Sequence, residues 1–112
     1  YRPPAVLSAQ FIFDDGVLEP AQLEAGLSHL CQRLTERLEG RAASRLGLSA
    51  NSAGLEFRAS RLSKEPLRDA GKLMRLAHLA LHDSGVLGLE VDELRLTLSG
   101  LHRPAVQDRL WQ

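Results

Sequence analysis

The chain has 112 residues, 44% of them hydrophobic, which fits one domain with a modest core. Its 14 basic and 14 acidic side chains cancel, so affinity for nucleic acid must come from a local cluster of one sign. A single cysteine, Cys31, excludes an internal disulfide and a cysteine zinc site, and it fits a reducing cytoplasm. Because there is neither a long apolar run nor a signal-peptide pattern, we expect a soluble protein without a membrane partner.

The first elements follow from the spacing of apolar residues. Tyr1-Arg2-Pro3-Pro4 is rich in proline and starts without methionine, so we expect residues 1–4 to be a linker from a missing upstream core. A period of two at Ala9, Phe11 and Phe13 predicts a strand. Apolar residues three and four apart then predict a helix over Pro20–Glu39, which begins at a proline and is followed by a glycine.

The second half of the chain repeats this alternation. A helix is predicted after Pro66, ending before Asp83, and a hairpin turn over residues 50–54. A period of two predicts three further strands around residues 46–48, 55–59 and 94–98. The order βαββαβ predicts an α+β domain over residues 5–101, with a four-stranded, mostly antiparallel sheet and both helices packed on one face.

The other face of this sheet, which we call the open face, is predicted to be polar because successive strand side chains point to opposite sides. It holds Ser8, Gln10, Ile12, Arg45, Gly47, Ser49, Glu56, Arg58, Ser60, Arg95 and Thr97. Arginine forks and hydroxyls bind phosphate oxygens, and Gly47 leaves room for a nucleic-acid backbone. The alternative is a solvated face with scattered charges, which Glu56 in its middle favours.

The C-terminal segment Gln107-Asp108-Arg109-Leu110-Trp111, behind the Pro104 turn, has the layout of a peptide hook. The amide of Gln107 suits a partner's backbone, and Leu110 and Trp111 suit an apolar pocket. The alternative is a helical tail whose apolar side chains fold back onto the domain.

The remaining candidates favour plain structural roles, without a cofactor. His78 and His82 are spaced for a metal but lack a third predicted ligand, and Cys31 is expected to be a half-buried apolar residue. Carboxylates near the first helix suit its dipole: Asp14, Asp15, Glu19 and Glu24. Basic helix residues belong to mixed-sign, solvated faces, with an accessory contact to DNA or to another domain as the alternative: Arg33, Arg37, Arg41, Arg68, Lys72 and Arg75.

The order of elements and several segments resemble the little-finger domain of Y-family DNA polymerases, the translesion enzymes, most closely the ImuB-like branch. The resemblance runs over nearly the whole chain. Its segments are residues 1–4, 9–13, 38–41, 43–48, 62–69 and 94–101, followed by the glutamine tail.

The resemblance implies a module that is joined to a palm, fingers and thumb core and grips the primer-template duplex with its sheet. By position it supports Arg45, Arg58 and Arg95 as phosphate contacts, helped by backbone amides around Gly47 and Ser49. A short peptide in this family, glutamine, any two residues, leucine and an aromatic, docks on the sliding clamp. Residues 102–112 are therefore expected to be a clamp-binding tail, which Gln107, Leu110 and Trp111 match, although Asp108 and Trp111 depart from the commonest form.

The resemblance also implies a role in damage-induced (SOS) mutagenesis in the bacterial cytoplasm, at the nucleoid, with other mutagenesis-complex proteins. The fragment itself would not be an enzyme. Whether the full-length protein is an active polymerase or an inactive adaptor stays open, because the metal-binding carboxylates lie outside this segment. The alternative function is a free-standing βαββαβ protein-interaction or regulatory domain that binds neither DNA nor clamp.

Overall fold

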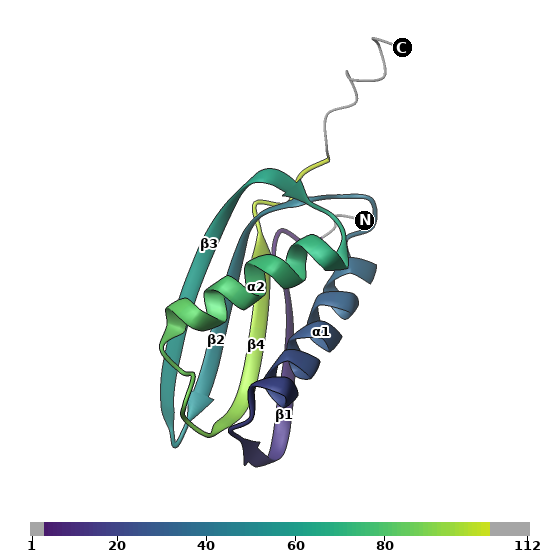
Figure 1. Ribbon diagram of the computed structural model, residues 1–112. Helices are drawn as coiled ribbons and strands as arrows, with labels where there is room; N and C mark the ends of the chain where they lie inside the picture. Colours follow the sequence, from purple (N-terminus) through teal and green to yellow (C-terminus); the bar gives the residue numbers. More distant parts are fainter. Residues whose placement is uncertain (1–3, 104–112) are drawn as a thin grey trace.

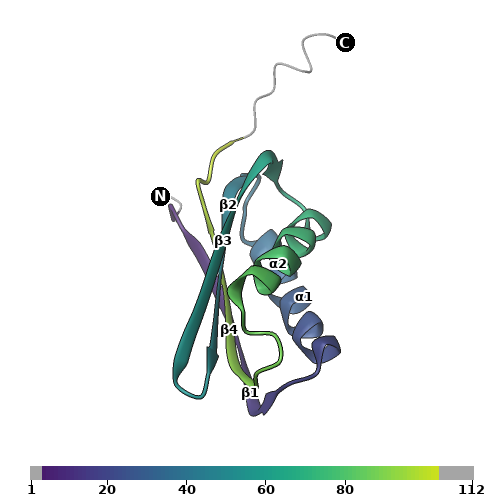
Figure 2. The same ribbon diagram turned by 60° about the vertical axis from the view of Figure 1, so that its left-hand side comes forward.

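The computed structural model describes residues 4–103, which form a four-stranded antiparallel sheet with two helices on one of its faces (Figure 1). The elements are β1 (Leu7–Val17), α1 (Pro20–Glu36), β2 (Ala43–Ser52), β3 (Leu55–Leu67), α2 (Ala70–Ser84) and β4 (Val91–Ser99). The strand order is β1-β4-β2-β3, and Figure 2 shows both helices on the same side of the sheet. The predicted α+β class and βαββαβ order are confirmed.

The core lies between the sheet and the helices. Leucines of α1 and of the inner sheet face are fully buried there: Leu23, Leu27, Leu30, Leu34, Leu46, Leu94, Leu96 and Leu98. Each buried leucine contributes roughly 1.5–3 kcal/mol relative to an exposed one. A slip of one residue in any strand would expose its leucines, so the core fixes which side chains reach the open face.

The turn between β2 and β3 is shorter than predicted. It consists of Ala53 and Gly54, whose φ angles of +50° and +81° fit the type I′ turn that suits strand twist. The predicted turn over residues 50–54 was too long, because Asn51 and Ser52 still pair with β3. Leu55, predicted to alternate into the core, is 64% exposed beside this turn.

Helix α1 ends at Glu36 rather than at the predicted Glu39. The chain leaves the right-handed helical region at Glu39, where φ is +54°, and at Gly40, where φ is +82°. Leu38 is nevertheless 3% exposed, so the apolar stripe continues beyond the helix and misleads a prediction based on period.

Helix α2 begins at Ala70 rather than directly after Pro66. The carboxylate of Asp69 accepts a hydrogen bond of 2.9 Å from the Lys72 N–H and caps the helix. Pro66 and Leu67 belong to the end of β3, and α2 continues through Asp83 to Ser84.

Arg41 was predicted to face solvent, but it is buried to 8% exposure. Its Nη1 donates to the Pro4 carbonyl at 2.6 Å and its Nε to the Leu38 carbonyl at 3.0 Å. Arg37 donates to the Ser8 carbonyl at 2.7 Å. Arg37 and Arg41 therefore hold the segment after α1 against the start of β1 and the residue Pro4 before it.

Candidate nucleic-acid interface

Strand pairing arranges the open face in rows that run across the sheet. In the central row, Arg95 of β4 lies opposite both Gln10 of β1 and Ser49 of β2, and Ser49 lies opposite Arg58 of β3. Beside it runs a row of small residues, Ser8, Thr97, Gly47 and Ser60. The next row contains Ser99, Arg45 and Leu62. The structure thus brings the three arginines of the prediction onto one uncovered face, from three different strands.

A depression of about 640 Å³ occupies the middle of this face. It is lined by Gly47, Leu48, Ser49, Asn51, Glu56, Arg58, Ala59, Ser60, Glu93, Arg95 and Thr97. Gly47 carries no side chain, and an added Cβ would lie 3.9 Å from the Thr97 Cβ. The absence of a side chain at Gly47 therefore leaves space that a backbone from outside can enter.

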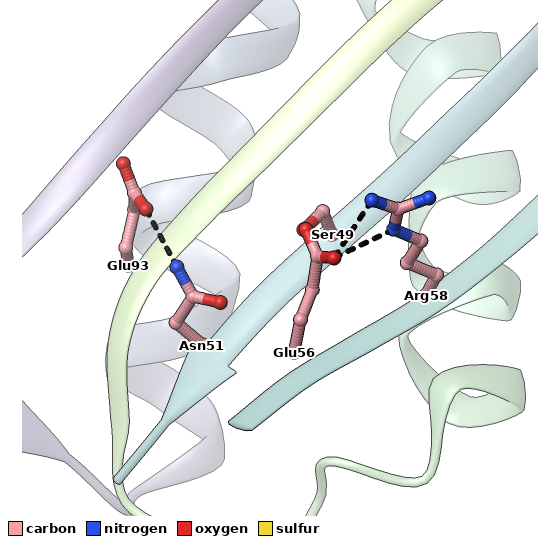
Figure 3. Close-up of polar contacts among 5 residues, drawn as sticks. All are labelled: Ser49, Asn51, Glu56, Arg58 and Glu93. Carbon is pink, nitrogen blue, oxygen red and sulfur yellow. Dashed lines mark hydrogen bonds and ion pairs between the residues drawn. The ribbon is translucent and has the colours of Figure 1, made fainter. Parts of the chain in front are cut away.

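In this depression, the carboxylate of Glu56 contacts the side chains of both Ser49 and Arg58 (Figure 3). Arg58 places its Nε and its Nη2 each 2.8 Å from Oε1 of Glu56. The Ser49 hydroxyl donates to Oε2 of Glu56, also at 2.8 Å. The hydrogen bonds from Ser49 and from Arg58 lower the pKa of Glu56 below its ordinary value, so the group is ionised at neutral pH. Ser49 and Arg58 therefore converge on one oxyanion.

Arg95 is held differently. Its Nη2 donates to the Gln10 side-chain oxygen at 2.8 Å, a neutral partner that leaves the guanidinium charge uncompensated by this contact. Arg45 is also exposed, between Ser99 and Leu62 on the neighbouring strands. Arg58 is thus the arginine of this set whose guanidinium forms an ion pair within residues 4–103.

The row nearest the β2–β3 turn is acidic. It contains Ile12, Glu93, Asn51 and Glu56. Asn51 donates to Glu93 Oε1 at 2.8 Å (Figure 3). Asn51 and Glu93 were not predicted on this face, because the predicted second strand ended and the predicted fourth strand began too close to the core leucines. Continued alternation past these leucines was the signal that could have placed both on the open face.

The helix-covered side of the domain has fewer candidate site residues than the open face. The His78 and His82 Nε2 atoms lie 3.2 Å apart, and His78 Nδ1 lies 3.3 Å from Glu24. Among residues 4–103, no three histidine, cysteine or acidic residues are grouped to hold a metal ion. Cys31 is 1% exposed rather than half-buried, and burial raises the pKa of its thiol to about 11.

Neither α1 nor α2 is both long and apolar enough to cross a membrane, within the part of the chain that is described. The predicted hook residues Gln107, Leu110 and Trp111 lie outside the described residues.

Comparisons with known proteins agree with this fold. Residues 6–110 match the model of the impB/mucB/samB family C-terminal domain. No curated protein matches the chain. A solved structure described as "Complex of beta-clamp processivity factor and little finger domain of PolIV" has the same fold, with a TM-score of 0.69 and 16% sequence identity over 90% of this chain and 92% of that one. The chain therefore belongs to the impB/mucB/samB family, as its C-terminal domain, and it shares the fold of the little finger in that solved structure.

Proposed function

We propose that this domain grips the backbone of a primer-template duplex with the open face of its sheet and tethers its parent protein to the sliding clamp through its C-terminal tail. The role is in translesion synthesis and damage-induced mutagenesis, at the bacterial nucleoid. The observation that carries the DNA proposal is the placement of Arg45, Arg58 and Arg95 around Gly47 and Ser49 on one uncovered face.

The arrangement suits phosphate groups. Arg58 and Arg95 lie on the two strands that flank β2, each directly opposite Ser49. Adjacent strands are about 4.8 Å apart, so a guanidinium stands on either side of the hydroxyl. Guanidinium and hydroxyl groups bind phosphate oxygens without reading bases, and Gly47 lets a backbone approach the strand closely.

Aromatic placement supports backbone contact over base stacking. Phe11 and Phe13 pack against the core on the helix side, with their ring centroids 5.0 Å apart, and Phe57 also packs there. Modules that read single-stranded RNA stack bases on aromatics exposed on the sheet. The described part of the open face carries arginines, hydroxyls, amides and carboxylates instead of aromatic rings.

The DNA proposal is tested by fluorescence anisotropy with a labelled primer-template duplex. The variant that replaces Arg45, Arg58 and Arg95 by alanine should bind more weakly, and its slope of log affinity against log salt should fall by about one for each lost phosphate contact. The control replaces three exposed arginines outside the open face by alanine and removes the same charge; they are Arg33 of α1, Arg68 just before α2 and Arg75 of α2.

Retained binding in the control, with loss in the open-face variant, supports the proposal. Equal affinities of the wild type and the open-face variant would contradict it and would favour a protein-interaction domain without a DNA role. Loss in the control alone would assign DNA contact to the helix side.

The clamp proposal rests on the sequence pattern of Gln107, Leu110 and Trp111 and on the family. The similar solved structure is described as a complex of a little finger with a clamp. Titration of the fragment against the host clamp should give micromolar binding, and the Leu110→Ala/Trp111→Ala variant should abolish it. The matched control is Asp108→Ala/Arg109→Ala, at the two positions of the motif that accept any residue. No binding by the intact fragment would contradict the proposal.

A further inference from the structure

We propose that Glu56 is an internal competitor for the DNA backbone: its carboxylate fills the oxyanion position formed by Ser49 and Arg58, and a phosphate group must displace it to bind there. The inference rests on the proposed DNA-binding function and adds a residue that sets its affinity. In the sequence, the acidic side chain of Glu56 favoured an ordinary solvated face.

The contacts of Glu56 are those that a phosphate would make. Both carboxylate oxygens are engaged, Oε1 by the Arg58 guanidinium and Oε2 by the Ser49 hydroxyl, with donor distances of 2.8 Å. Carboxylates and phosphates both accept paired hydrogen bonds from an arginine fork. Two donors that would hold a phosphate are thus already occupied by a group of the same charge sign.

The strand geometry places Glu56 close to both Arg58 and Ser49. Glu56 and Arg58 are separated by one residue in β3, so both side chains lie on the open face. Ser49 pairs directly with Arg58, which puts it diagonal to Glu56. These positions are set by the backbone ladder, and the ion pair between the side chains forms without any other element.

The contact is also free to break. The Arg58 side chain is 76% exposed and that of Glu56 44% exposed, so water can replace either partner. Exposed ion pairs are weak and are screened by salt. An incoming backbone phosphate carries one negative charge, as the carboxylate does, and its free oxygens can therefore take over Ser49 and Arg58 without disturbing the fold.

A positioning role for Glu56 predicts the opposite outcome. If Glu56 served to hold Arg58 in the orientation that DNA needs, its removal would weaken binding. Competition predicts that removal strengthens binding, so the sign of the effect separates the two roles.

The test compares Glu56→Gln with Glu93→Gln in the same duplex titration. Glu93 is an acidic residue of the same row that accepts a hydrogen bond from Asn51 and forms no ion pair with an arginine of residues 4–103, so it controls for the loss of one negative charge. Glu56→Gln should tighten binding about fivefold beyond Glu93→Gln. In an Arg58→Ala background the advantage of Glu56→Gln should disappear.

The outcomes separate this inference from the proposed function. Duplex binding by the wild type with equal affinities of the two glutamine variants, or weaker binding by Glu56→Gln, would overturn the competitor and leave the DNA role intact. Absence of duplex binding by all folded variants would overturn both. Circular dichroism of each variant verifies folding, which surface changes of this kind preserve.

Discussion

Gly47 of β2 and Thr97 of β4 lie directly opposite each other on the open face, and a Cβ added to Gly47 would be in ordinary contact with Thr97, 3.9 Å from its Cβ. The missing side chain is thus not required by packing within residues 4–103. A side chain added at Gly47 can therefore change DNA binding without a clash that lowers the stability of the domain.

Gly47→Val is predicted to keep or raise stability and to weaken DNA binding. Glycine inside a strand costs roughly 0.5–1 kcal/mol relative to alanine, and valine suits strands better. The new side chain would fill part of the depression that a backbone must enter. Urea denaturation and duplex anisotropy measure the two effects. Thr97→Val, which adds no bulk, is the control; duplex affinity of Gly47→Val equal to that of the wild type would exclude close approach at this position.

Gly26→Leu is predicted to destabilise the domain by about 1–3 kcal/mol, because overpacking forces neighbouring side chains to move. Gly26 is buried in α1, and an added Cβ would lie only 2.9 Å from Cζ of Phe13. Ala25→Leu places the same side chain at an exposed neighbouring position and should change stability by no more than about 0.5 kcal/mol. Equal unfolding midpoints in urea for the two variants would show that Phe13 does not restrict Gly26.

Ala53→Asn is predicted to stabilise the β2–β3 turn, whereas Gly54→Ala should destabilise it. Ala53 has a φ of +50°, which costs a residue with a Cβ about 1–2 kcal/mol and which asparagine tolerates better. Gly54 has a φ of +81° with no atom within 4 Å of an added Cβ, so any cost there comes from the backbone alone. Thermal unfolding measures both changes, and a decrease in Tm for Ala53→Asn would contradict the type I′ assignment.

Cys31 is predicted to resist alkylation by iodoacetamide at pH 8 in the native protein and to react after unfolding in urea. Burial raises the pKa of Cys31 from 9.0 to about 11, so the native state holds its proton more tightly than the unfolded state. The resulting contribution to stability is complete below pH 9.0 and is lost as the pH rises to about 11. The Cys31→Ala variant should not show this loss of stability at high pH. Rapid labelling of the native protein at pH 8 would contradict the burial of Cys31.

Period and alternation were sufficient to place the arginines on one face. The inner leucines are so strongly apolar that Arg45, Arg58 and Arg95 had to point the other way once the strands were recognised. Their pairing was not predictable, because register depends on the turn. A turn over residues 50–54 would put Ser49 opposite Leu55, whereas the shorter turn at Ala53 and Gly54 puts Ser49 opposite Arg58.

The limits of the elements were less predictable for a related reason. Leu38 and Leu67 continue the apolar stripes of the two helices, although Leu38 follows α1 and Leu67 ends β3. A buried leucine reports contact with the core and not the local backbone conformation. The cap at Asp69 sets the start of α2, and α1 ends where Arg37 and Leu38 change to hydrogen bonds with residues three positions earlier; only the cap has a recognisable sequence signal.

DNA binding by the open face can be observed in a titration of the isotope-labelled domain with a primer-template duplex, followed by amide NMR shifts. We expect the shifts to cluster in β2, β3 and β4, around Gly47, Ser49, Arg58 and Arg95, while the outer surfaces of α1 and α2 stay unchanged. Shifts confined to the helices, or no shifts at low salt, would contradict it.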